Sequence, residues 1–172
     1  YTDKGKSYKV LLSFSEEGGM TGHAQGERTD TLSEGMNSAL PCQLYVLNKD
    51  TGELAGEEFS KEVESCKVDT KPSEGSQKME YVEPVYNESF PNAAYVSDIN
   101  YVSDSGTNDI QWTLTMKNGD TIFLSTRLTI EKQPAVSYYA EDTPMETTEE
   151  LNALLASIEE EASADTPVYL HL

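Results

Sequence analysis

Hydrophobic and polar residues alternate along several short stretches of the chain, which is the pattern of a strand with one buried face. The clearest stretch is 110–116, where every second residue is large and apolar: Ile110, Trp112, Leu114 and Met116. Other apolar stretches are bounded by glycine or polar turn residues and predict further strands. They cover 8–14, 42–47, 59–68, 78–86, 95–104, 121–130 and 168–172. Residues 16–41 contain five glycines and little periodicity, so we expect a loop there with one strand or helical turn near 28–36.

The turn at 117–120 sets the register of the two strands that it joins. Asn118-Gly119 is typical of a two-residue turn, which would place Leu114 opposite Phe123. A three-residue loop with a left-handed glycine places Leu114 opposite Ile122 instead, and brings the apolar residues of both strands onto one face. Because a slip of one residue inverts every side chain, burial should decide the register. We therefore predict the three-residue loop.

Helical spacing replaces strict alternation toward the end of the chain. Thr143-Pro144-Met145-Glu146 has the capping residue, early proline and third-position glutamate of a helix start. Apolar residues then recur at i, i+3, i+4 and i+7 and form one stripe: Leu151, Leu154, Leu155 and Ile158. This predicts a helix from Pro144 to Ser163. Together these elements predict an α+β fold, with one domain over 1–172 and the C-terminal amphipathic helix packed on a mostly antiparallel β-sheet of six to eight strands.

The net charge of the chain limits the classes of partner that it can bind. The chain has 172 residues, with 31 acidic against 12 basic side chains and a formal net charge of −19. A surface this negative repels phosphate backbones and anionic lipids, so we expect no nucleic-acid binding. No apolar run reaches the roughly 20 residues that span a bilayer.

Cys42 and Cys66 are an even pair with no metal-type spacing. We predict that they form a disulfide, which indicates an oxidising compartment and an extracellular or cell-surface location. The alternative is a pair of buried, unpaired thiols. The excess of tyrosine over phenylalanine, 10 against 4, agrees with the extracytoplasmic location.

Candidate catalytic and metal-binding residues are few. His23 and His171 are the two histidines, and a small hydrolase would have to use His23, although no nucleophile motif accompanies it. Asp98, Asp104 and Asp109 form an oxygen-rich cluster that lacks the order of a calcium loop and is typical of a polar turn; calcium binding there stays open. We expect no catalytic residue, no metal site and no cofactor.

Two stretches resemble a known family. They are WTLTMKNGDT at 112–121 and DTPMETTEELNALLASIEEE at 142–161. Both are similar to the extracellular tails of beta-lactam-sensor-like membrane metallopeptidases of Gram-positive gut bacteria. The chain lacks that family's H-E-x-x-H helix and membrane spans. The resemblance therefore implies only an extracytoplasmic accessory or sensing module, tethered to a membrane-anchored parent protein.

These observations favour a non-enzymatic, extracytoplasmic domain of a bacterial secreted or cell-surface protein that binds or senses a protein, peptide or glycan. The first alternative is a glycan- or peptide-binding adhesin module. Its face would use tyrosines of the predicted strands, namely Tyr81, Tyr86, Tyr95, Tyr101, Tyr138 and Tyr139. The second alternative is a small hydrolase that uses His23.

Overall fold

A computed structural model describes residues 1–14, 27–86, 93–139, 146–162 and 166–171 of the chain. His23 and the helix start predicted at Thr143 lie outside these residues. Within the described part, no helix is long and apolar enough to cross a membrane.

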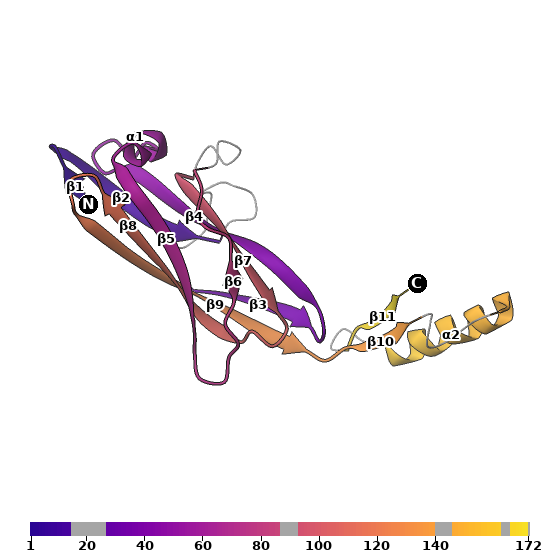
Figure 1. Cartoon of the computed structure of the whole chain (residues 1–172). Helices are drawn as coiled ribbons and strands as arrows, with labels where there is room; N and C mark the ends of the chain where they lie inside the picture. The colour runs from indigo at the N-terminus through magenta and orange to yellow at the C-terminus, as the bar shows by residue number, and fades with distance from the viewer. Residues whose placement is uncertain (15–26, 87–92, 140–145, 163–165, 172) are drawn as a thin grey trace.

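Two β-sheets face each other and form the body of the molecule (Figure 1). The five-stranded sheet has the order β1-β2-β4-β7-β6 and is antiparallel throughout. Its strands are β1 (Thr2–Asp3), β2 (Lys6–Ser13), β4 (Asn37–Asn48), β7 (Tyr95–Val102) and β6 (Glu80–Tyr81). The four-stranded sheet has the order β3-β9-β8-β5. Its strands are β3 (Arg28–Ser33), β9 (Thr121–Gln133), β8 (Thr107–Met116) and β5 (Val63–Pro72).

One core fills the space between the sheets, because each strand turns alternate apolar side chains inward. Leu44 and Ile99 come from the five-stranded sheet, and Trp112 and Leu128 from the four-stranded sheet; all four are fully buried in the same cluster. The short helix α1 (Gly56–Ser60) adds Phe59 at the end of the body that lies away from the C-terminal segment (Figure 1). Burying side chains of this size contributes roughly 1.5–3 kcal/mol each.

The predicted register of the β8–β9 hairpin is confirmed. Leu114 lies opposite Ile122 and Trp112 opposite Leu124. Gly119 has a φ of 92°, the left-handed conformation that the three-residue loop requires. Phe123 consequently points outward and is 76% exposed. Burial of one common apolar face thus outweighed the usual preference of Asn-Gly for a two-residue turn.

The predicted fold class is wrong. The protein is mainly β, with two facing sheets rather than an α+β arrangement of one sheet and a covering helix. The C-terminal helix α2 (Thr148–Glu161) lies beyond the end of the sheets and packs on neither of them (Figure 1). It is flanked by β10 (Val136–Tyr139) and β11 (Val168–His171), which pair in parallel. The apolar stripe predicted the helix correctly, but a stripe does not specify what covers it.

Local details also differ from the predictions. β3 pairs with β9 in parallel, so the four-stranded sheet is mixed. The segment 59–68 is not one strand as expected. Phe59 belongs to α1, and the strand β5 starts only at Val63. Helix α2 is capped by Thr147, whose side chain accepts a hydrogen bond from Glu150 N while the Glu150 side chain reaches back to the cap. The capping box therefore lies one turn later than predicted.

The predicted disulfide is not formed, and Cys42 and Cys66 are free thiols. Cys42 lies in β4 and Cys66 in β5, which belong to different sheets. The prediction treated these consecutive strands as neighbours, whereas α1 carries the chain from one sheet to the other. Burial raises the pKa of each thiol to about 12, so both stay protonated at neutral pH.

Candidate functional site

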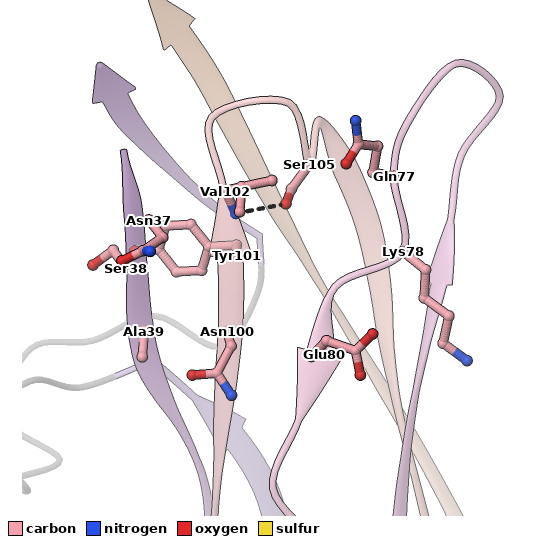
Figure 2. A pocket seen from close by; sticks show the side chains of 10 residues that line it. All are labelled: Asn37, Ser38, Ala39, Gln77, Lys78, Glu80, Asn100, Tyr101, Val102 and Ser105. Atoms are coloured by element: carbon pink, nitrogen blue, oxygen red, sulfur yellow. Dashed lines mark hydrogen bonds between the residues drawn. The ribbon is translucent and has the colours of Figure 1, made fainter. Parts of the chain in front are cut away.

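A polar groove lies at the end of the five-stranded sheet that is nearer the C-terminal segment, and its volume is about 560 Å³. Figure 2 shows the side chains that line it. They come from the start of β4, the end of β7, the segment leading into β6 and the turn after β7. These residues are Asn37, Ser38, Ala39, Asn100, Tyr101, Val102, Gln77, Lys78, Glu80 and Ser105.

The groove forms because the segment that precedes β6 diverges from β7, the strand with which β6 pairs. Pairing between the two strands is limited to Glu80 with Asn100 and Tyr81 with Ile99. One residue earlier, Met79 turns inward and is almost completely buried. Its carbonyl accepts a hydrogen bond from the Thr70 hydroxyl of β5. The chain at 77–79 is thereby drawn toward the other sheet, which opens a space beside the end of β7.

A buried asparagine, Asn108 of β8, holds three parts of the groove wall together. Its Oδ1 accepts a hydrogen bond from Met79 N at 3.1 Å, and its Nδ2 donates to Gln77 O at 2.9 Å and to Ser105 O at 3.1 Å. A buried amide with its hydrogen bonds made fixes the segments that it joins, because breaking any bond would leave a polar group unpaired. The groove wall is therefore preorganised.

The turn at 103–106 closes the groove at the end of β7. Val102 N donates to the Ser105 hydroxyl at 2.9 Å, and Ser105 N donates to Val102 O at 3.0 Å. Both backbone groups of Val102 are thus occupied, so the strand offers no free edge at this position. Recognition in the groove has to come from side chains.

The lining side chains are mostly neutral hydrogen-bonding groups. Asn37, Asn100 and Gln77 project from three segments and are exposed, and none of their side-chain amides has a hydrogen-bond partner among the described residues. Each amide offers both donors and an acceptor. Ala39 and Val102 add small apolar surface between them. Such a lining suits a polar ligand that itself presents alternating donors and acceptors.

Charge in the groove is limited. Lys78 Nζ is paired with Asp69 Oδ1 at 2.8 Å, and this ammonium group holds the pKa of the Asp69 carboxyl below its usual range. Glu80 is exposed and contributes a negative charge. Tyr101 is buried, and its hydroxyl donates to Asp30 Oδ2 at 3.3 Å. Burial raises the pKa of this phenol, so it remains a donor at neutral pH.

Most candidate residues from the sequence do not meet in the structure. Asp104 pairs with Lys132 at 2.9 Å and Asp109 with Arg127 at 2.8 Å, while Asp98 lies in β7. No group of His, Cys, Asp and Glu side chains that could hold a metal ion occurs among the described residues. The three aspartates that the sequence placed in an oxygen-rich cluster are therefore not gathered into one group among the described residues. His171 ends β11 in the C-terminal segment, far along the chain from the groove.

The tyrosines whose side chains the structure describes do not form one face either, and the side chains of Tyr138 and Tyr139 lie outside the described part. Tyr101 is buried, Tyr81 and Tyr95 are half-buried, and Tyr86 is exposed with its ring 6.3 Å from that of Tyr95. The amides of the groove were missed because they are scattered over 37–100 and belong to no motif. Only the topology of the two sheets brings them together.

Comparisons with known proteins identify no family. The sequence matches no protein-family model and no curated protein. Among solved structures, CopC from Methylosinus trichosporium OB3b matches with a TM-score of 0.30 and 9% identity, over 60% of this chain and 84% of CopC. The BIgI domain of beta protein from S. agalactiae, bound to CEACAM1, matches with a TM-score of 0.32 and 9% identity, over 74% of this chain and 99% of that domain. A family 123 glycoside hydrolase from Clostridium perfringens matches with a TM-score of 0.35 and 9% identity, over 93% of this chain and 37% of that enzyme. Likeness this slight carries no argument about ligand or activity.

Proposed function

We propose that this chain is a non-enzymatic, extracytoplasmic binding domain that holds an extended, polar segment of a partner protein in the groove beside β7. The observation that carries the proposal is the set of exposed amides of Asn37, Gln77 and Asn100 on a wall that Asn108 fixes. An extended peptide presents N–H and C=O groups in alternation, which side-chain amides match as donors and acceptors. A preformed wall lowers the ordering cost of binding.

Charge restricts the partner segment to neutral or basic sequences. The chain carries a net charge of −19, and the exposed groove carboxylate Glu80 adds to this potential locally. The groove ammonium of Lys78 is already paired with Asp69. An acidic segment would be repelled, and a basic one would approach faster at low ionic strength.

The alternatives are less well supported by the groove. Among the described residues the lining contains no imidazole or thiol, and the Ser105 hydroxyl is used in the turn, so no histidine base stands beside the serines of the lining. Its aromatic residue, Tyr101, is buried and cannot stack on a sugar ring. Glycan binding in this groove is therefore less favoured than peptide binding, while His23 lies outside the described residues.

The extracytoplasmic location rests on the sequence. The free thiols remove the argument from a disulfide, and the excess of tyrosine over phenylalanine remains in its favour. The resemblance of 112–121 and 142–161 to extracellular tails of membrane metallopeptidases is in keeping with this location and stays a prediction.

A peptide library provides the test. We expect neutral and basic library peptides to bind the wild-type chain, and the double variant Asn37→Ala, Asn100→Ala to bind them at least about tenfold more weakly, a loss of about 1.4 kcal/mol. Asn152→Ala removes an exposed amide from α2 and serves as the matched control, with unchanged affinity. Acidic scrambled peptides should not bind. Equal binding by the wild type and the double variant would contradict the proposal.

A further inference from the structure

The outer face of the four-stranded sheet is a second surface, on the other side of the sandwich from the groove. Because β8 and β9 turn their apolar residues inward, their outward positions carry hydroxyls and amides. They include Gln111, Thr113, Thr115, Thr121 and Ser125. Phe123 stands among them and has the largest exposed fraction, 76%, of the large apolar residues in the described part of the chain. A single exposed phenylalanine is normal on a protein surface, so the evidence for a binding site has to come from the residues around it.

Three cross-strand rows form those surroundings. Phe123 lies opposite Thr113, Ser125 opposite Gln111, and Arg127 opposite Asp109. Successive rows are about 7 Å apart, since each spans two residues of a strand. The face therefore offers an aromatic ring, then a hydroxyl and an amide, then a charged pair. These groups lie along one line within reach of a single small ligand.

A hollow of about 250 Å³ begins one row from Phe123. It is lined by Glu27, Asp109, Ser125, Thr126 and Arg127. Within it, Arg127 Nε donates to Asp109 Oδ1 at 2.8 Å, and Arg127 Nη1 lies 3.5 Å from Glu27 Oε1. The Arg127 side chain is nevertheless 44% exposed and that of Asp109 32%. The planar guanidinium is held in place and keeps further N–H donors for a ligand.

We propose that this face binds a neutral saccharide, with the apolar side of one pyranose ring stacked on Phe123. The neighbouring hydroxyls would hydrogen-bond with Ser125 and Gln111, and the next sugar unit would reach the Asp109–Arg127 pair. A sugar hydroxyl both donates and accepts, so a paired carboxylate and guanidinium satisfy it better than either group alone. Aromatic rings bind the apolar side of such ligands, and a few fixed polar groups provide the specificity.

Charge and composition exclude the other occupants. The net charge of −19 and the carboxylate of Glu27 disfavour anionic sugars and phosphates. Phe123 is a single ring among hydroxyls, an amide and the Asp109–Arg127 charged pair, whereas the core of a protein interface is depleted of charged residues. The saccharide site goes beyond the proposed peptide groove and uses none of its residues.

The test begins with an array of neutral and anionic oligosaccharides, followed by titration of the neutral ones that bind. We expect the wild-type chain to bind at least one neutral saccharide with a Kd of about 1 mM or tighter, and Phe123→Ala to weaken this binding at least about tenfold. Phe123→Trp should retain the affinity within about threefold and show a fluorescence change on binding. Trp112 is the chain's one tryptophan and is fully buried, so the new indole reports from the face.

Two further variants separate the saccharide site from other effects. Gln111→Ala should weaken saccharide binding about threefold, because it removes one hydrogen-bonding group. Val82→Ala truncates another exposed apolar residue, which directly follows β6 of the five-stranded sheet. This variant should leave the affinity for saccharide unchanged. The groove variant Asn37→Ala, Asn100→Ala should also bind saccharide normally, so the two proposals fail independently. Absence of neutral-saccharide binding at about 10 mM, preference for anionic sugars, or unchanged binding by Phe123→Ala would each overturn the inference.

Discussion

The sandwich and the C-terminal segment place the same kind of amphipathic pattern in different surroundings. In β8, the apolar side chains face the other sheet, and Trp112 and Leu114 are fully buried. In α2, the apolar stripe is only half-buried, and Leu155 is 42% exposed. β10, α2 and β11 extend away from the body (Figure 1), and the two strands form a parallel pair without a further strand among the described residues. A two-stranded ribbon alone has little stability.

The comparison shows that a local sequence pattern determines which secondary-structure element forms, but not which part of the molecule packs on its apolar face. Alternation in β8 is completed by the facing sheet, so each inward side chain finds apolar neighbours. The helical stripe of α2 has no facing sheet among the described residues, although Tyr169 of β11 connects the segment to Ser33 of β3 through a 2.6 Å hydroxyl contact. We therefore expect the sandwich to unfold as one cooperative unit and the C-terminal helix to contribute little to its stability.

The largest expected effect is that of Trp112→Ala. The side chain lies between Val68 of β5 and Leu124 of β9 and is fully buried, so its truncation should leave a large cavity. We expect a loss of about 3–5 kcal/mol in the free energy of unfolding, measured by urea denaturation. Leu155→Ala on α2 is the matched truncation and should change the same free energy by less than about 0.5 kcal/mol. Equal effects of the two variants would remove the distinction between the regions.

The reactivity of the two buried thiols tests the packing of the sandwich interior without a mutation. Burial raises the pKa of Cys42 and Cys66 from 9.0 to about 12, which lowers the thiolate fraction near neutral pH about a thousandfold. Since the thiolate is the reacting form, both should react much more slowly with an aromatic disulfide reagent in the folded protein than in urea. The measurement is the release of the coloured thiol product. Fast labelling of folded protein, or no labelling after unfolding without reductant, would contradict the free, buried thiols.

Parts of the fold that depend on one residue pattern were predictable. The β8–β9 register followed from alternation, because only one pairing buries Trp112, Leu114, Ile122 and Leu124 together. The helix α2 also followed from its pattern, but its start did not. Thr143–Glu146 and Thr147–Glu150 are successive capping-box sequences, and local spacing does not choose between them.

Parts that depend on how elements come together were not predictable. The disulfide prediction was wrong, and its premise of two neighbouring strands did not hold, because α1 moves the chain from the sheet of Cys42 to the sheet of Cys66. The groove amides belong to segments far apart in the sequence. Asn37 and Asn100 come together through the pairing of β4 with β7, and the buried Asn108 holds the segment of Gln77 beside them. A single asparagine within a strand has no spacing that would indicate this role.

A smaller effect is expected from Thr147→Ala at the start of α2. The Thr147 hydroxyl accepts a hydrogen bond from Glu150 N at 3.2 Å, and its loss should cost the helix about 1 kcal/mol. We expect a lower helical signal in circular dichroism at 222 nm, while the urea midpoint of the sandwich stays unchanged. Thr148→Ala, one residue later and outside the capping box, is the control with an unchanged helical signal. A shift of the sandwich midpoint would mean that the two regions are coupled after all.

The smallest expected effect is the pH dependence of the same helix start. Glu150 Oε2 accepts hydrogen bonds from Glu146 N at 2.8 Å and Thr147 N at 3.1 Å, and these bonds hold the pKa of its carboxyl below the ordinary 4.5. A carboxyl with a depressed pKa stabilises the folded helix at pH values above its unfolded pKa, and this contribution is lost as the pH falls through the folded pKa. The difference in helical signal between the wild type and Glu150→Gln isolates this contribution of the Glu150 carboxyl.

That difference should be constant from pH 7 to about pH 5 and should shrink below the ordinary pKa of 4.5. Glu149→Gln removes a charge from the same first turn but leaves the capping box intact, so it controls for the dipole alone. The Glu150 carboxyl is fully exposed, and the effect is accordingly confined to the helical signal, with no change in the unfolding midpoint of the sandwich. A difference that persists or grows at pH 3 would show that the charge of Glu150 does not support the cap. A parallel pH-dependent shift of the sandwich midpoint would show that the cap senses the body, which the separation of the two regions in Figure 1 argues against.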